Sequence, residues 1–235
     1  MNRVDGESCF VLHLRPYRDT SALVNLFSPQ YGRFTCVVKG LRGSSRSRQP
    51  WRAALQVFNA VSVNWQGRGE LKSMLDVQHQ RSYHLKERAL FCGFYINELL
   101  ERLLHQHDPQ VEIFALYAQC LSELETAQDL QPSLRRFEFA LLDALGYGLN
   151  FNQCNHTARP IEAGFFYQFK AGQGLVFSDD GQGFAGELLL QIANDNFSGA
   201  ALPIAKQLAR QALRELLGSK PLLSRDLFRG SYKPS

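Results

Sequence analysis

The chain has 235 residues, of which 45% are hydrophobic and 20% charged, and its formal net charge is +4. This composition is typical of a soluble globular protein with one large or two ordinary domains, and it excludes fibrous and disordered classes. No apolar run approaches the ~18 residues of a membrane span, and the first residues lack the apolar segment of a signal peptide. We therefore expect a cytoplasmic protein that contacts no membrane.

The first third of the chain predicts a small β barrel. Apolar and polar residues alternate in Val61, Val63 and Trp65, and turn residues recur at the spacing of roughly 8 to 12 residues that is typical of small barrels. About five strands in about 80 residues fit an OB-fold. The expected strands cover residues 9–17, 21–28, 32–38, 57–66 and 69–77.

A cation-rich loop, VVKGLRGSSRSRQPW, follows the third expected strand. No acid occurs between Asp19 and Glu70, and residues 1–81 carry 12 Lys/Arg against 5 Asp/Glu, a balance of +7. When Lys or Arg side chains neutralise DNA phosphates, they release the counterions condensed on the DNA, so the loop predicts a DNA contact. The alternative is a solvated surface hairpin. The candidate DNA-binding residues are Arg33, Lys39, Arg42, Arg46, Arg48, Arg52 and Arg68, and base stacking is open to Tyr17, Tyr31, Trp51 and Trp65.

From Tyr83 onward the hydrophobic period becomes helical. Asp108 and Pro109 are expected as the N-cap and first residue of a second helix, and a β-hairpin is expected over 165–177, followed by a polar loop over 178–186. Helices are expected over 84–107, 110–124, 132–146 and 203–218, with a short final helix capped by Ser224.

The five cysteines contain no C-x-x-C pair, which fits reduced thiols.

The predicted fold class is therefore α+β and multidomain. An OB-fold β barrel in residues 1–80 is followed by a mainly helical C-terminal domain in residues 81–235, with a small β-hairpin insertion within 150–200.

Several segments, in order along the chain, resemble the RecO family of bacterial recombination mediators. They are FVLHLRPYRDTSALVNLFSPQYGRFTCVVKGLRGSSR, GFYINELLERLL, LRRFEFALLDALGYGLNF and GSKPLLSRDLF. The resemblance implies an OB-fold with a helical domain, and a nucleoid-associated protein that binds single- and double-stranded DNA and anneals complementary strands. It further implies binding to the acidic C-terminal tail of single-stranded-DNA-binding protein (SSB), and cooperation with RecR in loading RecA. No cofactor is expected.

Many members of this family hold a zinc ion with four cysteines after the LGY segment, and this sequence departs from that pattern. Cys154 matches the first ligand position, but Thr157 stands where a C-x-x-C partner would be, and Phe177 stands where a second pair would begin. A structural zinc site needs four donors, and Cys154 with His156 supplies at most two. We predict no metal site.

Arg135 and Arg136 are the candidates for binding the SSB tail, partly on the strength of the resemblance. The tail presents acidic residues and ends in a phenylalanine with a free carboxylate, so its receptor needs an apolar pocket rimmed by arginine. The alternative is one solvent-facing cation and one paired with an acid such as Glu138 or Asp143. The sequence leaves open which arginine would contact the tail.

Catalysis is not expected, because no Walker A spacing, nucleophile with a base, or carboxylate cluster stands out. The first hypothesis is a non-enzymatic mediator. A second is a metal-dependent DNA-processing enzyme that uses Asp179, Asp180 and Asp195, and a third is an adaptor without a direct DNA role.

Overall fold

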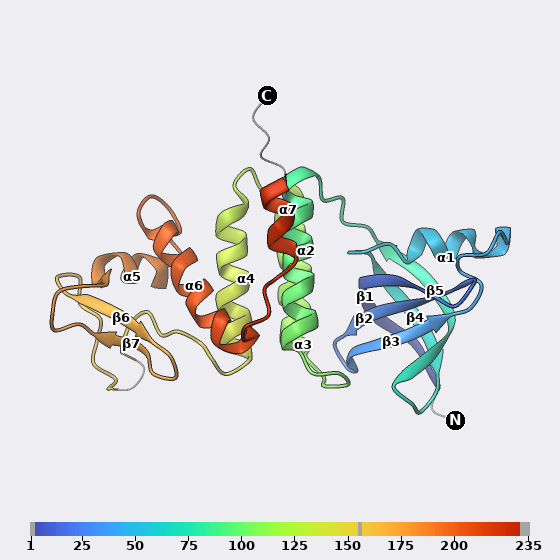
Figure 1. Cartoon of the computed structure of the whole chain (residues 1–235), viewed down its shortest axis with the longest axis horizontal. Helices are drawn as coiled ribbons and strands as arrows, with labels where there is room; N and C mark the ends of the chain where they lie inside the picture. Colours follow the sequence, from blue (N-terminus) through green and yellow to red (C-terminus); the bar gives the residue numbers. More distant parts are fainter. Residues whose placement is uncertain (1–2, 155–156, 231–235) are drawn as a thin grey trace. The chain divides into compact units, whose positions relative to one another are not determined.

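A computed structural model describes residues 3–154 and 157–230 (Figure 1). The chain divides into two compact units. Unit 1 consists of Met1–Glu125 with Leu222–Ser235, and unit 2 is Thr126–Pro221. An N-terminal barrel is followed by a helical region with a small second sheet, which confirms the predicted fold class.

The strands of unit 1 close into a barrel in the order β1-β2-β3-β5-β4. The pairings are antiparallel except between β3 and β5, which run parallel, and this arrangement is consistent with the predicted OB-fold. The strands are β1 (Arg3–Tyr17), β2 (Ser21–Ser28), β3 (Gly32–Val38), β4 (Ala60–Gln66) and β5 (Leu71–Arg81).

The barrel interior is built by strict alternation along β3 and β4. Phe34, Cys36 and Val38 point inward from β3, and Val61 and Trp65 do so from β4. Burial raises the pKa of Cys36 to about 12, so this thiol is a neutral core side chain.

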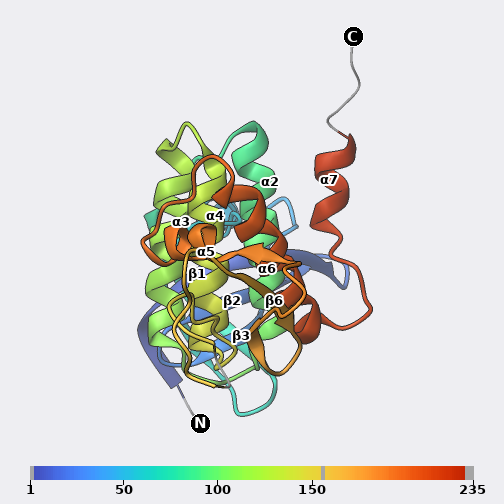
Figure 2. The same ribbon diagram turned by 90° about the vertical axis from the view of Figure 1, so that its left-hand side faces the viewer.

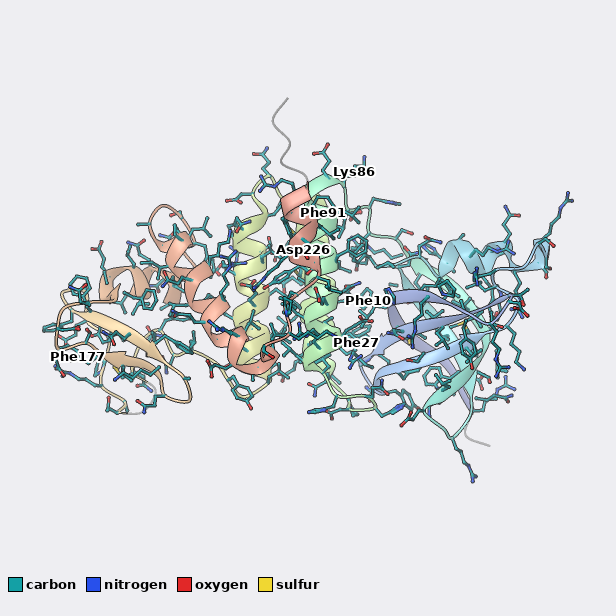
Figure 3. The ribbon with its side chains drawn as sticks, viewed as in Figure 1. Phe10, Phe27, Lys86, Phe91, Phe177 and Asp226 are labelled. Carbon is teal, nitrogen blue, oxygen red and sulfur yellow. The ribbon has the colours of Figure 1, made fainter. Side chains whose placement is uncertain are left out.

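The middle of β1, residues 9–12, and most of β2 are buried on both faces because helices cover their outer side. Phe10 and Phe27, labelled in Figure 3, contact the ring of Phe114 at centroid distances of 4.8 and 5.6 Å. Phe114 belongs to α3 (Val111–Thr126), which follows α2 (Glu87–Leu103). The helices thereby turn the outer face of the barrel into a second apolar layer of unit 1.

A buried hydrogen-bond network joins β1, α2 and α3. The Asn97 side chain donates through Nδ2 to the Leu12 carbonyl at 2.8 Å and accepts from the Tyr117 hydroxyl at 2.6 Å. Burial raises the pKa of Tyr117, so its hydroxyl keeps the proton that it donates. Because these bonds satisfy buried polar groups, they fix α2 and α3 in one register on the barrel.

The chain returns to unit 1 in α7 (Ser224–Gly230). The short final helix is present as expected, but Ser224 is its first residue and not its N-cap. The Glu98 carboxylate on α2 accepts hydrogen bonds from the backbone N–H groups of Leu223 and Ser224, at 2.9 and 2.8 Å, and from the Ser224 hydroxyl at 2.6 Å. The rings of Phe91 and Phe228 pack edge to face at 5.7 Å. A helix this short depends on such contacts for its stability.

Unit 2 combines helices with a small sheet of order β7-β6-β8. Figure 2 labels its strand β6 and its helices α4, α5 and α6. Its core includes Tyr167, Leu189 and Leu208. The expected hairpin is present, but β8 and α5 lie in or beside the segment expected to be a polar loop. The elements are α4 (Leu130–Ala144), β6 (Phe166–Lys170), β7 (Gly174–Phe177), β8 (Phe184–Ala185), α5 (Gly186–Ala193) and α6 (Ala201–Leu217).

The start of one helix differs from the prediction. The third expected helix begins at Leu130, where Asp129 is the N-cap, because the Asp129 carboxylate accepts from the Gln131 N–H at 3.0 Å. Among residues 3–154 and 157–230, no helix has the length and apolar character needed to cross a bilayer.

Candidate nucleic-acid interface

The cation-rich segment is an ordered structure that we call the basic loop, residues 39–48. It leaves β3 through Gly40, whose φ of +69° suits glycine, and the Gly43 N–H donates to the Gly40 carbonyl at 3.2 Å. The Arg42 N–H donates to the Thr20 carbonyl at 2.8 Å, which ties the loop to the β1–β2 turn. The loop ends in η1 (Arg46–Arg48), and α1 (Gln49–Ala54) follows it; neither helix was expected from the sequence.

Arg52 on α1 holds the basic loop in shape. Its guanidinium donates to the carbonyls of Leu41 at 2.5 Å, Ser45 at 3.2 Å, and Gly43. Bonds to three carbonyls fix the loop from within. The structure thus gives Arg52, one of the candidate DNA-binding residues, a role in organising the other cations.

The remaining cations of the loop face solvent or an aromatic ring. Lys39, Arg42 and Arg46 are exposed, and Arg48 is half-buried because its guanidinium lies 4.0 Å from the centroid of the Trp51 ring. Such a contact leaves the guanidinium positive and restricts its position. The loop therefore presents a fixed group of positive charges to solvent.

Sequence reasoning missed Arg15 and Arg18. The barrel register pairs Tyr17 with Ser21 and Ala22 with Val38, so the β1–β2 turn lies beside the start of the basic loop. Both arginines are exposed, and Arg42 Nη1 lies 3.4 Å from the Arg18 carbonyl oxygen that accepts its hydrogen bond. The sequence could have indicated this, because the tight turn between the first two expected strands lies at the end of the barrel where the third strand leads into the basic loop.

Arg33 and Arg68 lie away from the basic loop. Arg33 is at the opposite end of β3 from Val38, and its guanidinium donates to the Leu104 carbonyl after α2, at 2.7 and 3.1 Å. Desolvation lowers the pKa of Arg33, and nearby Glu101 opposes this shift. Arg68 is exposed in the β4–β5 turn, before Leu71 pairs with Thr35. Their DNA contacts stay predictions.

Among the aromatic candidates, Trp65 belongs to the barrel core. It is 3% exposed and contacts Phe34 and Tyr31. Tyr31 retains 40% exposure, and Tyr17 and Trp51 are partly buried beside arginines. A base can therefore reach the outer three rings more readily than Trp65.

Arg135 and Arg136 occupy different environments in unit 2 although they are adjacent on α4. The Arg135 side chain is 4% exposed, and its Nη2 lies 2.8 Å from Glu138 Oε1. One of the two arginines is thus paired with Glu138, which is the alternative to tail binding that the sequence left open.

Arg136 is 40% exposed and forms an ion pair with Asp195, its Nε lying 2.7 Å from Oδ2. It lines a cavity of about 550 Å³ that also contains the aromatic side chains of Phe139, Phe151 and Phe197. The rings of Phe139 and Phe197 are stacked at 6.3 Å, and that of Phe151 meets Phe139 edge on at 4.9 Å. The cavity thus combines one arginine and three aromatic rings with the carboxylates of Asp143 and Asp195.

The side chains at the expected zinc position do not fit a four-thiolate site. Cys154 is 2% exposed in the apolar core of unit 2, and its N–H and carbonyl bond to the backbone of Arg159 and Ala158. Phe177 contacts the ring of Phe165, and the Arg159 guanidinium lies 4.7 Å from the Phe177 centroid. His156 lies outside the described residues. An aromatic ring therefore occupies the Phe177 position, where a thiolate ligand would be required.

Two of the three acids considered for an enzyme, Asp180 and Asp195, have other contacts. Asp195 pairs with Arg136, and the Asp180 carboxylate accepts hydrogen bonds from the Ser178 hydroxyl and the Gln182 N–H, which lower the pKa of Asp180. Within residues 3–154 and 157–230, no three His, Cys, Asp or Glu side chains are grouped closely enough to hold a metal ion.

Comparison with known proteins gives matches over nearly all of the chain. Residues 1–83 match the family model "Recombination protein O N terminal", and residues 84–226 match "Recombination protein O C terminal". The chain is 44% identical over 232 residues to the DNA repair protein RecO of Cellvibrio japonicus, covering 96% of this chain and 97% of that protein. It is 41% identical over 224 residues to that of Actinobacillus pleuropneumoniae serotype 5b, covering 93% and 92%. For Haemophilus influenzae strain PittGG the identity is 39%, covering 93% of each chain.

Proposed function

The chain belongs to the recombination protein O family, and we infer from this membership that it acts in DNA repair and recombination. We propose that it is a non-enzymatic mediator that binds single- and double-stranded DNA and anneals complementary strands. We further propose that it binds the C-terminal tail of SSB and, together with RecR, promotes the loading of RecA.

The observation that carries the DNA-binding part is the basic loop beside the β1–β2 turn. Lys39, Arg42 and Arg46 are exposed, and Arg15 and Arg18 add their charges at the same end of the barrel. Cations that neutralise phosphates favour binding of any sequence and lower the repulsion between two approaching strands. Such a surface promotes annealing without a covalent step.

An annealing assay tests this function. Two complementary labelled oligonucleotides are mixed with the protein in EDTA and without a nucleotide, and duplex formation is followed by energy transfer. We expect the protein to accelerate annealing and to leave both strands at full length. Mg²⁺-dependent shortening of the strands, abolished in Asp179→Ala, would instead support a DNA-processing enzyme.

The cavity beside Arg136 supports the proposed SSB-tail site. Docking the terminal phenylalanine among the aromatic rings would place its carboxylate near Arg136 as a replacement for Asp195. The present ion pair is exposed, with side-chain exposures of 40% and 59%, so exchanging its carboxylate costs little, about 0 to 1 kcal/mol. Arg135 already has a buried partner.

We expect Arg136→Ala to weaken binding of an acidic peptide ending in phenylalanine by about 10- to 100-fold, because it removes one charged hydrogen bond. Asp195→Asn should strengthen binding, since it removes the competing carboxylate. Fluorescence anisotropy of a labelled peptide measures both effects.

Lys170→Ala removes an exposed charge of the same unit outside this cavity and is the matched control. Amidating the C-terminus of the peptide removes the carboxylate that Arg136 would bind. Wild type should therefore bind the amidated peptide as weakly as Arg136→Ala binds the free acid. Equal binding of the free acid by wild type and Arg136→Ala would rule out this site.

A further inference from the structure

Helix α6 presents a cationic face that the proposed function does not use. Its inward face consists of small and apolar residues such as Ala205, Leu208 and Ala212, which are buried. Arg210 and Arg214 are exposed, and Lys206 is half-buried one turn earlier. The three cations are spaced at i, i+4 and i+8, so they form one row, with neighbours about 6 Å apart along the helix axis.

Helix stability does not explain Arg210 in this row. Like charges at i, i+4 destabilise a helix by about 0.2 to 0.5 kcal/mol per pair, and the row contains two such pairs. The helix dipole favours a cation in the last turn, which explains Arg214 but does not reach Arg210. The Arg210 and Arg214 side chains form no ion pair or hydrogen bond with residues 3–154 or 157–230.

The positive charge is concentrated locally rather than spread over unit 2. Thr126–Pro221 contains 8 Lys/Arg and 9 Asp/Glu, a balance of −1, yet α6 has no acid before Glu215. The exposed residues beside the row are Pro203 and Gln207, which offer no large apolar anchor. Regular charges without an apolar pocket suit a phosphate backbone better than an acidic peptide, whose receptors add an apolar pocket.

We propose that the row Lys206, Arg210 and Arg214 is a second contact for the DNA phosphate backbone, on unit 2 and separate from the basic loop. One chain then has a DNA-binding surface on each compact unit. Because the two surfaces belong to one chain, DNA strands bound to them are kept at a high effective concentration relative to each other. The second surface therefore promotes annealing beyond what the basic loop achieves alone.

The test compares Arg210→Gln/Arg214→Gln with Arg159→Gln/Lys170→Gln. Both double variants lower the formal net charge from +4 to +2 within unit 2. The affinity for fluorescent single-stranded DNA is measured across a salt series. The α6 variant should lower the slope of log affinity against log salt by about 1.4, at about 0.7 per lost contact, and the control should leave the slope near that of wild type.

Combining the α6 changes with alanine at Lys39, Arg42, Arg46 and Arg48 separates this inference from the proposed function. Residual salt-dependent binding by the four-alanine variant, removed by the added α6 changes, supports a second surface. Equal slopes for the α6 variant and its control overturn the inference and leave the basic loop as the DNA site. Failure of wild type to bind DNA contradicts the proposed function itself. Thermal unfolding of the α6 variant should stay close to that of wild type, because the relieved repulsion offsets the lost interaction of Arg214 with the helix dipole.

Discussion

Replacing Lys39, Arg42, Arg46 and Arg48 together with alanine will flatten the salt dependence of single-strand binding by about 3 units, and will weaken binding about 100-fold or more at 0.1 M salt. Each lost cation contributes about 0.7 to the slope when it neutralises one phosphate. The four side chains come from one ordered loop and its first helical turn, so they act on the same stretch of backbone. Anisotropy of fluorescent DNA over a salt series measures the slope directly.

A variant with the same change in charge is the control for this experiment. Lys86, Arg88, Arg159 and Lys170 are exposed and lie outside the barrel, and their replacement by alanine also removes four positive charges. An equal loss of slope in both variants would show that only net charge matters. An unchanged slope in the basic-loop variant would contradict binding at this loop.

Arg52→Ala provides a second contrast within the same loop. Its guanidinium bonds to backbone carbonyls, so its loss should loosen residues 41–45 more than it reduces the number of phosphate contacts. We expect faster amide hydrogen exchange in those residues and weaker DNA binding. The slope of log affinity against log salt should fall by less than the value of about 0.7 for one phosphate contact.

The second large effect concerns stability. Glu138→Ala will destabilise unit 2 by about 3 to 5 kcal/mol, because it leaves the Arg135 charge buried without its carboxylate partner. The two side chains are 4% and 1% exposed and lie 2.8 Å apart. Urea denaturation followed by circular dichroism measures the loss.

The double replacement Arg135→Met/Glu138→Leu tests the origin of this cost. Removing both charges should restore stability to within about 1 to 2 kcal/mol of wild type, or above it, since apolar residues avoid the desolvation of an ion pair. Trp51 and Trp65 both belong to unit 1, so their fluorescence follows that unit while circular dichroism follows both. A Glu138→Ala protein that unfolds in urea like wild type would contradict the assignment of a buried charge pair.

The sequence predicted the strands well because their signals are local. Residues 21–28 and 32–38 agree in both bounds with β2 and β3, where alternation and turn residues set the limits. It did not predict α1, although Pro50 is a helix-start signal, because the Gly and Ser residues before it suggested a loop. It also missed α5, whose eight residues give too short a periodic pattern.

The candidate site was predictable as a segment but not as a set of contacts. A cation whose guanidinium bonds to a helix-end carbonyl, as Arg33 does, has no local signature that separates it from a solvent-facing one such as Arg46. Arg135 and Arg136 likewise differ only in the direction that successive helix residues face, which depends on packing elsewhere in the fold. Those distinctions come from tertiary contacts between residues distant in the chain.

The return of the chain to unit 1 has a consequence for folding during synthesis. α2 is translated before unit 2, whereas α7, which Glu98 and Phe91 hold against α2, is translated after it. The barrel with its basic loop can form early, because its strands are close in sequence, but unit 1 reaches its final packing only when the 96 residues from 126 to 221 have been made. A ribosome-bound chain that stops before Leu222 therefore has a complete barrel and an α2 surface still open to other proteins.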